Sequence, residues 1–573
     1  MPDLSQTQPF AFTCEGGLIK SRSTFVMQPG QALELLNFEP DIKGGYRRIS
    51  GFRRQINHIV PQTSASSEKV LMVAFFNNNI LAARGEKIFS SASTELATAI
   101  TSSATMSGSG TITVDSTSGF SSSGTLQINS EIFTYTGKTS TTFTGVTRAT
   151  SSTSAAAHAV DDAVSESWTE RDTGRTSASK YSFERFNFDG NDKIIVTDGT
   201  NDPTVFNTSL AATDVTESSV EGAKFVTAFK SHMFYAGMSS TPQELVFSQP
   251  FDEDAFNTGS GAGSIKVDDT IVGMKAFRND LFVFCENRIF KLSGTSSSDF
   301  AITPVTRNIG CVNGDTIQEF AGDLIFLGPD GLRTVAGTAR IGDVELGTIS
   351  ANVQSIFDEN LVDAALFESV VIPDKTQYRI FFAKDGQGED NTRGVICVMK
   401  GQNFEFSELR GIKPSATDTF VEAGDVLVLH GGYDGYIHRQ EKGNDFDGTK
   451  VSGRYRSPDL TFGDPGIRKH MQRVIVNYKP ESAINADMFV RYDYEDRNSS
   501  RPAAYPLDSE DVVAIYGTST YGTPTYGGAS QPLLRQSVEG SGFAVALRVN
   551  DNATTAPYSL KGFQLEYQLG ARR

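Results

Sequence analysis

The sequence predicts an all-β protein built around a β-propeller of about six to eight blades. Three observations lead to this prediction: many short apolar runs separated by turn formers, a hairpin signature that recurs along the chain, and almost no helical periodicity. The clearest stretch reads as three strands, Ile271–Phe277, Leu281–Cys285 and Arg288–Leu292, joined by tight turns. A lone meander cannot bury its own faces, so it must pack against copies of itself.

The hairpin signature occurs seven times. Its turns fall near Asn79, Asp192, His232, Asp280, Asp323, Lys375 and Asp425, and from Asp192 onward the spacing is 40 to 52 residues. A four-stranded propeller blade repeats at about 40–50 residues. The sequence therefore predicts seven propeller units. Helical patterns are confined to the short segments Asn352–Asn360 and Asp363–Ser369.

One interval is too long for a single unit. The turns at Asn79 and Asp192 are 113 residues apart. Removing one repeat of about 45 residues leaves roughly the length of segment 98–165, which is dominated by Ser, Thr, Ala and Gly. We interpret it as a small inserted β domain with strands at Thr111–Val114, Gly124–Asn129, Glu131–Thr136 and Thr142–Val146. A disordered linker is the alternative, although linkers do not alternate apolar residues as Leu126–Ile128 does.

These boundaries divide the chain into five parts. Residues 1–60 form an entry segment, and residues 450–573 form a sheet-rich tail with expected strands such as Met488–Tyr494 and Leu560–Leu569. Residues 61–97 form the first propeller unit, 98–165 the insert (a tip or an adhesin-like module) and 166–449 the remaining units. The loop Gly517–Ser530 is expected at an interface or a tip.

Composition excludes several classes of protein. The net charge of −17 argues against a protein that coats nucleic acid. Four dispersed cysteines without CxxC spacing predict neither a disulfide framework nor a zinc site. The longest apolar run, Val70–Phe76, is too short to cross a membrane, and no signal peptide is visible. We expect a chain made in a cytoplasm that stays soluble or is assembled there.

No catalytic constellation can be assembled. The six histidines are scattered; His430 and His438 flank the Gly431–Gly435 turn and could face each other, but they lack a third metal ligand at a telling spacing. A propeller glycoside hydrolase is the enzyme alternative. Carbohydrate clefts usually contain aromatic side chains on which sugar rings stack, and a single tryptophan, Trp168, argues against such a cleft. The sequence thus predicts no enzyme, no cofactor and no metal.

The densest basic cluster comprises Arg47, Arg48, Arg53 and Arg54. Such a cluster suits a contact with phosphates or with an acidic partner. A strand whose solvent face carries arginines is the alternative interpretation.

Three segments resemble a known family. ALELLNFEPDIKGGYRRISGF (residues 32–52) resembles the N-terminal segment of the tail nozzle, or packaged-DNA stabilisation (tail tubular), proteins of short-tailed bacteriophages. SPDLTFGDPGIRKHMQRVIVNYK (Ser457–Lys479) and the terminal FQLEYQLGARR resemble the platform part of the same proteins. That family carries a β-propeller between these parts, and the insert has no counterpart we can match.

The resemblance implies a virion structural protein in which residues 1–60 and 450–573 join into one β-rich platform domain. The protein would form a homo-oligomeric, usually hexameric, ring below the portal and its adaptor ring, alongside tail fibres. The ring would retain packaged DNA and conduct it at ejection without reading its sequence, and an acidic lumen would keep phosphates from sticking. Arg47, Arg48, Arg53, Arg54, Arg572 and Arg573 would then lie at a subunit or adaptor interface. A tail fibre or receptor-binding adhesin, with 98–165 as the binding module, is the other class that stays open.

Overall fold

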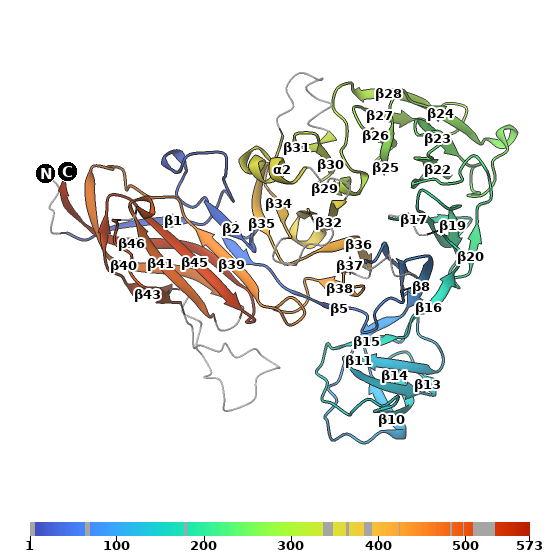
Figure 1. Cartoon of the computed structure of the whole chain (residues 1–573), viewed down its shortest axis with the longest axis horizontal. Coiled ribbons are helices and arrows are strands. Elements are labelled where there is room, and N and C mark those ends of the chain that lie inside the picture. The colour runs from blue at the N-terminus through green and yellow to red at the C-terminus, as the bar shows by residue number, and fades with distance from the viewer. Residues whose placement is uncertain are drawn as a thin grey trace.

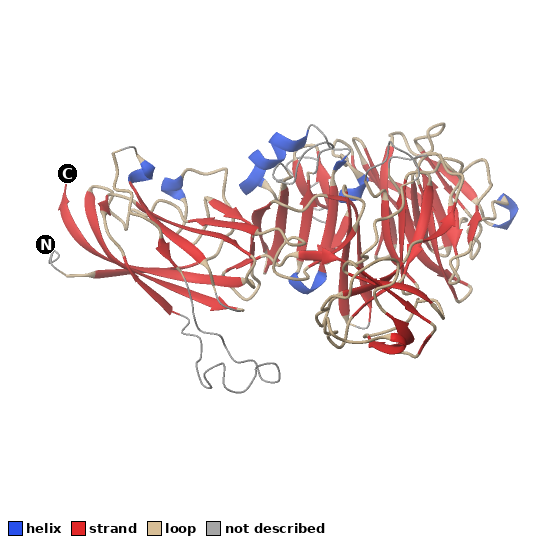
Figure 2. Ribbon diagram, turned by 60° about the horizontal axis from the view of Figure 1, so that its bottom comes forward, coloured by secondary structure: helices blue, strands red, loops and turns tan. Residues whose placement is uncertain are grey.

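The structure is a computed structural model that describes residues 6–62, 69–176, 180–335, 348–361, 366–382, 392–422, 424–481, 484–496, 498–507 and 533–572. Nearly all its regular structure is β-strand (Figure 2). The longest helix of this part is α2 (Gln354–Asn360), and the other helical turns are η1 (Thr24–Val26), η2 (Thr258–Ser260), η3 (Gly314–Thr316), η4 (Ala351–Val353), η6 (Pro373–Lys375) and η8 (Asp493–Glu495). The predicted all-β class is confirmed.

Six antiparallel sheets of three or four strands form the self-contained blades of a propeller. The first blade contains β6 (Met72–Phe76), β7 (Asn79–Arg84), β8 (Lys87–Ser91) and β16 (Thr169–Asp172), and the second contains β17 (Ser182–Phe188), β18 (Asn191–Thr197), β19 (Thr204–Phe206) and β20 (Ala212–Asp214). The third contains β21 (Phe225–Phe229), β22 (His232–Ala236), β23 (Glu244–Phe247) and β24 (Gly263–Lys266), and the fourth contains β25 (Ile271–Phe277), β26 (Asp280–Cys285), β27 (Ile289–Ser293) and β28 (Ala301–Thr306). The fifth contains β29 (Gln318–Phe320), β30 (Asp323–Gly328) and β31 (Gly331–Thr334). The sixth comprises β36 (Pro414–Glu422), β37 (Asp425–Gly432), β38 (Ile437–Gln440) and, from the N-terminal segment, β5 (Phe52–Arg54).

The ring of blades closes through their innermost strands (Figure 1). Strand β6 contacts both β17 and β36, and β21 lies between β17 and β25. The remaining gap is filled by β32 (Glu368–Ile372), β33 (Gln377–Phe381), β34 (Gly394–Lys400) and β35 (Asn403–Leu409), whose β32 contacts β29 and β36. The fold is therefore a closed β-propeller.

All seven predicted hairpins are present. The turn positions expected near Asn79, Asp192, His232, Asp280, Asp323, Lys375 and Asp425 each join the first and second strands of a unit. In the turns Asn77–Asn78, Lys230–Ser231 and Ala321–Gly322 both residues have positive φ, the geometry of a type I′ turn. This geometry matches the right-handed twist of paired strands, which explains why the turn signal was readable.

The platform is a two-sheet sandwich made from both ends of the chain. One sheet contains β1 (Gln8–Thr13), β3 (Phe38–Pro40), β4 (Tyr46–Arg48), β46 (Tyr558–Arg572), β40 (Ile467–Pro480), β43 (Leu533–Ser537) and β44 (Ser541–Gly542). The other contains β2 (Glu34–Leu36), β39 (Val451–Arg456), β45 (Val545–Ala553), β41 (Ala486–Tyr492) and β42 (Tyr505–Pro506). Because β2 pairs with β35, this second sheet continues without a break into the propeller as one nine-stranded sheet.

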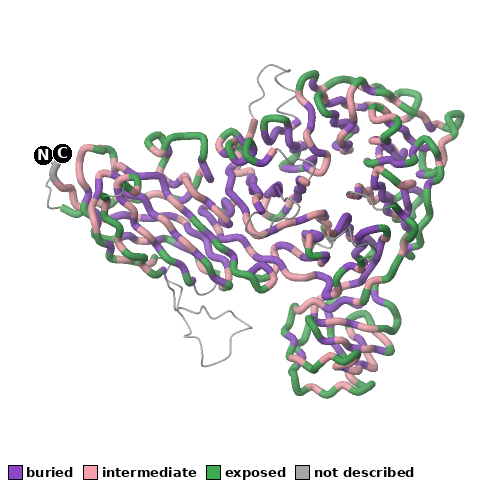
Figure 3. The backbone as a smooth tube through the Cα atoms, viewed as in Figure 1, coloured by how far each residue is buried: buried purple, intermediate pink, exposed green. Residues whose placement is uncertain are grey.

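One hydrophobic cluster spans the platform and the adjoining blades. It includes Tyr455 and Leu565 from the platform, together with Tyr378 on β33 and Leu327 on β30 from the propeller. Figure 3 shows this buried interior running from the sandwich into the ring. The platform and the propeller thus share a core.

The inserted segment folds on its own sheet beside the first blade. Its strands are β9 (Ser93–Glu95), β10 (Ser107–Thr113), β11 (Gly124–Ile128), β12 (Glu131–Tyr135), β13 (Gly137–Lys138), β14 (Thr142–Thr147) and β15 (Ala163–Glu166). A separate cluster that includes Leu126, Phe133 and Phe143 forms its core. The sheet begins before residue 98 because β9 pairs with β15.

Two sequence expectations need correction. Residues 1–60 do not belong wholly to the platform, because Phe52–Arg54 completes the blade of β36–β38 by pairing with β38. The helical segment expected at Asp363–Ser369 lies partly outside the described residues; Leu366 is in a 3-10 turn, and from Glu368 the chain is strand β32. The loop Gly517–Ser530 lies outside the described residues. No helix in the described part is long and apolar enough to cross a membrane.

Candidate functional site

The predicted arginine cluster is divided between two strands and two faces. Arg47 and Arg48 are neighbours on β4, so their side chains point in opposite directions. Arg48 is fully buried in the sandwich, where its Nε lies 3.3 Å from Asp551 Oδ2 and its Nη1 donates to the Ala553 carbonyl at 3.0 Å. A side chain this buried does not reach a partner, so the interface role expected for Arg48 is wrong.

Arg53 and Arg54 belong to β5, at the edge of the propeller. Arg53 donates from Nη2 to Asp445 Oδ2 at 2.9 Å. Arg54 pairs with Asp447 (Nε to Oδ2, 3.0 Å) and covers the Tyr436 ring at 3.9 Å. Both side chains remain about two-fifths exposed. Their role at an interface stays a prediction.

The terminal arginines lie at the end of β46. Arg572 is the last residue of this strand and pairs in register with Ile467. The Arg572 side chain and all of Arg573 lie outside the described residues, so their predicted interface role is untouched by the structure.

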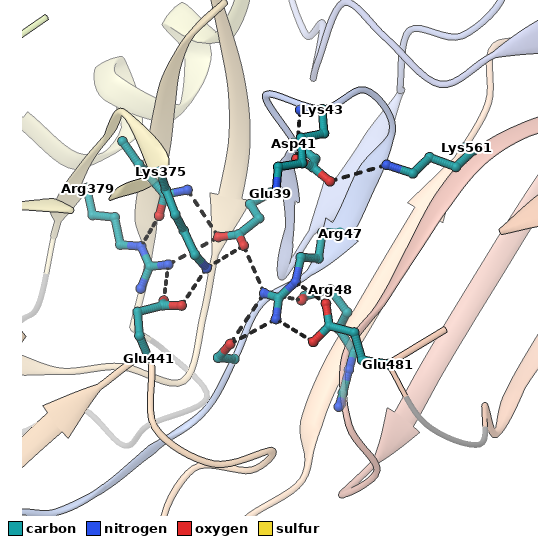
Figure 4. Close-up of polar contacts among 12 residues, drawn as sticks. Glu39, Asp41, Lys43, Arg47, Arg48, Lys375, Arg379, Glu441, Glu481 and Lys561 are labelled. Carbon is teal, nitrogen blue, oxygen red and sulfur yellow. Dashed lines mark hydrogen bonds and ion pairs between the residues drawn. The ribbon is translucent and has the colours of Figure 1, made fainter. Parts of the chain in front are cut away.

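Arg47 belongs to a charged cluster that sequence analysis did not foresee (Figure 4). We call it the joint network; its members are Glu39, Arg47, Lys375, Arg379, Glu441 and Glu481. Glu39 is at its centre, because its Oε1 lies 3.1 Å from Arg47 Nη1 and 2.6 Å from Lys375 Nζ. Glu39 Oε2 lies 3.3 Å from Arg379 Nη2, and Arg379 is fully buried.

The outer members of the joint network tie three parts of the fold together. Glu441 follows strand β38 and pairs with both Lys375 and Arg379. Glu481 follows β40 of the platform and binds Arg47 through Nε at 2.6 Å and through Nη2 at 2.9 Å. Burial alone would raise the pKa of Glu441, but Lys375 and Arg379 hold this pKa below its ordinary value. The network therefore fastens the platform to two blades.

A second charged cluster lines the bore of the propeller. Lys180, just before β17, lies with its Nζ 2.8 Å from Asp315 Oδ2 and also pairs with Glu368, which begins β32 on another part of the ring. Arg185 on β17 pairs with Asp418 of β36 and donates from Nε to the Phe75 carbonyl at 2.7 Å. These ion pairs link innermost strands that line one cavity of about 270 Å³.

Glu368 is a perturbed carboxyl of the bore. Burial raises its pKa from 4.5 to about 7, and Lys180 only partly opposes this effect. Its Oε2 accepts a hydrogen bond from Thr417 Oγ1 at 3.2 Å. The sequence signal for this cluster was available: charged residues interrupt the innermost strands at Glu184–Arg185 and Asp418, where a buried strand would otherwise be apolar.

The remaining candidates offer no reactive arrangement. His430 and His438 do face each other, since they are register partners whose rings stack 4.9 Å apart. Both are buried against Phe52 at the β5 edge. Within the described residues no group of three or more His, Cys, Asp and Glu side chains is placed to hold a metal ion.

Comparisons with known proteins bear on the fold alone. No protein-family model matches the chain, and no curated protein matches it. Similar solved structures include the Pan2 WD40 domain of Neurospora crassa (7% identity, 66% of this chain and 91% of that chain, TM-score 0.30) and the N-terminal domain of Nup159 (10% identity, 46% and 89%, TM-score 0.28). Another is Raptor of Chaetomium thermophilum (8% identity, 70% and 29%, TM-score 0.35). Likenesses this weak carry no argument about function.

Proposed function

We propose that this chain is a structural subunit of a bacteriophage tail nozzle. In this proposal a ring of copies, hexameric by resemblance, extends the DNA channel below the portal and adaptor, holds packaged DNA back and conducts it at ejection. The subunit is a part of the virion and has no enzymatic role. The observation that carries the proposal is the joining of both chain ends into one sandwich that continues into a propeller.

A conduit under DNA pressure needs subunits that do not bend between their parts. Bending at the joint would break the nine-stranded sheet between β2 and β35, separate a shared core and expose the buried charges of the joint network. Each of these changes is costly, since buried charges that lose their partners destabilise a fold by about 3–5 kcal/mol. Platform and propeller are thus built to move as one body.

The size of the bore bears on where DNA would pass. The side chains of Lys180 and Arg185 line a cavity of about 270 Å³ there, which is far too small for a DNA duplex. The proposal therefore places DNA on the axis of the ring, between subunits, and not inside each propeller. A chain of net charge −17 repels phosphates there, which suits a surface along which DNA must slide.

The test is the assembly state of the purified protein. Native mass spectrometry and negative-stain microscopy are performed on the chain alone and with its adaptor ring. We expect hollow rings, either spontaneously or on the adaptor. A protein that stays monomeric and does not bind the adaptor ring, or one that forms a trimeric spike, would overturn the proposal.

A receptor-binding role is the second candidate, and one observation favours it. The insert has its own sheet and its own core beside the first blade, as a grafted binding module would. This role would be favoured over the nozzle role if the full chain binds host cells or surface glycans and forms no ring with the adaptor. Release of sugars from a glycan panel would instead indicate a propeller hydrolase.

A further inference from the structure

The outer face of the platform presents two aromatic rings to solvent. Phe25 of η1 is 69% exposed and Tyr494 of η8 is 41% exposed, with their ring centroids 5.2 Å apart. The segment that carries Phe25 is fixed to the platform, because Thr24 Oγ1 donates to Asp459 Oδ2 at 3.2 Å and accepts from the Asp459 amide at 2.9 Å. Large apolar groups held out in pairs are typical of contact surfaces.

Tyr494 is held in an unfavourable backbone conformation. Asp493, Tyr494 and Glu495 have consecutive φ angles of 47°, 59° and 61°, in the left-handed region that non-glycine residues avoid. The conformation is fixed by Asp493, whose Oδ1 accepts from the amides of Phe543 (2.6 Å) and Ala544 (3.2 Å). Such strain persists where the surrounding structure imposes it, and it gathers at binding sites.

Arginines crowd the sheet beside the aromatic pair. Arg456 on β39 and Arg548 on β45 are direct register partners, and like charges opposite each other destabilise a sheet. Two carboxylates lie beside them. Glu34 Oε1 is 3.4 Å from Arg548 Nη2 and 3.8 Å from Arg456 Nη1. Glu495 Oε1 is 3.6 Å from Arg548 Nη2 and 3.8 Å from Arg456 Nη2. The side chains of Arg456 and Arg548 are about one-fifth exposed. Arg454, further along β39, is about half exposed.

We infer that this surface docks an acidic surface of a second copy of the chain. We call it the aromatic–arginine face and define it by Phe25, Tyr494, Arg454, Arg456 and Arg548. Aromatic and arginine side chains dominate the residues that carry binding energy at protein interfaces. A copy of this chain is a fitting partner because its net charge is −17. The inference rests on the proposed ring and names one side of its subunit contact.

The chain carries a complementary surface on the β21–β24 blade. Phe251 is 57% exposed, also has a positive φ (63°), and is flanked by the exposed Asp252 and Asp254. Burial, with the charges of Asp252 and Glu253, raises the pKa of Asp254. A contact between two different patches on successive copies is heterologous, and such contacts form a ring where the rotation between copies closes.

The first experiment removes the aromatic–arginine face without disturbing the fold. The variant combines Phe25→Ser, Tyr494→Asn and Arg454→Glu; asparagine tolerates the left-handed conformation at position 494. Val421→Ser, at an exposed apolar residue of β36, is the matched control. Native mass spectrometry and sedimentation velocity, with and without the adaptor ring, should show self-association at least tenfold weaker for the variant and unchanged for the control.

The second experiment swaps the charges. We expect Arg454→Glu alone to weaken self-association and Asp252→Arg, added to it, to restore part of the loss. Recovery supports the contact between the two patches, whereas no recovery overturns the assignment of the Phe251 loop.

The outcomes separate the two proposals. Rings that form equally well from the triple variant overturn the aromatic–arginine face and leave the nozzle proposal standing. A wild-type chain that never self-associates, even on the adaptor, overturns both.

Discussion

The joint network and the bore both take charges out of water, but they balance them differently. The joint network has three carboxylates, Glu39, Glu441 and Glu481, and three cations. In the bore, Lys180 alone faces both Asp315 and Glu368. As a result the pKa of Glu441 is lowered, whereas burial raises the pKa of Glu368 to about 7.

This difference shows that charge balance, and not burial alone, decides what a buried carboxyl does. A carboxyl that two cations hold stays ionised and fastens neighbouring elements. A carboxyl that shares one cation with another acid ionises only at a cost. We therefore expect the joint to weaken in acid and the bore to weaken in base.

The largest expected effect is removal of Arg379 from the joint network. Arg379→Ala leaves Glu39 and Glu441 buried with fewer cations, so we expect a loss of about 3–5 kcal/mol in the free energy of unfolding. Urea unfolding followed by circular dichroism measures it. Lys87→Ala, which breaks a partly exposed pair with Glu170, is the control and should cost about 1 kcal/mol or less. Equal losses for the two variants would contradict the comparison.

The second prediction concerns acid. Because the folded pKa of Glu441 lies below its ordinary value of 4.5, its contribution is complete above that pH and is lost as the pH falls through the folded pKa. The protection of the β33 amides relative to intrinsic exchange at the same pH should therefore fall below about pH 4.5. In Glu441→Gln this protection should already be low at pH 7 and should change little with pH. Wild-type protection that does not change in acid would argue against a balanced joint network.

The third prediction has the opposite sign. The folded pKa of Glu368, about 7, lies above its ordinary value of 4.5, so its contribution is complete below pH 4.5 and is lost as the pH rises through 7. Glu368→Gln, which leaves Lys180 paired with Asp315, should therefore stabilise the fold above pH 7 by about 1–3 kcal/mol relative to wild type. Fluorescence of the single tryptophan, Trp168, which packs between the first blade and the β36–β38 blade, reports the unfolding. If Glu368→Gln is less stable than wild type at pH 8, burial does not make the ionised Glu368 carboxylate unfavourable.

The smallest effect is expected at an exposed pair on the rim of a blade. Arg288 and Asp268 are 38% and 64% exposed, and such pairs contribute little because water and salt screen them. Asp268→Asn should change the free energy of unfolding by about 0.5 kcal/mol or less. Thermal unfolding at two salt concentrations measures it, and a loss above about 2 kcal/mol would show that exposure is a poor guide here.

Much of the fold could be predicted because its information is local. The hairpins at His232 and Asp280 combine turn residues with short apolar runs, and both features lie within a dozen residues of chain. The assignment of Phe52–Arg54 to the platform failed because β5 pairs with β38, nearly four hundred residues away. No local pattern marks such a partner.

The candidate sites show the same division. Sequence analysis found Arg47 and Arg48 as a basic cluster, but strand alternation sends one into the joint network and the other into the sandwich beside Asp551. Lys180 and Glu368 were missed because they become neighbours only when the ring of blades closes.

By itself the sequence determined the all-β class, the repeated hairpins and the inserted module, since turn chemistry and alternation act between near neighbours. Only the tertiary structure decided that one sheet runs from platform to propeller and which carboxylates are balanced. These outcomes depend on pairing between distant segments, and the free energy of a buried charge depends on every group that the completed fold places around it.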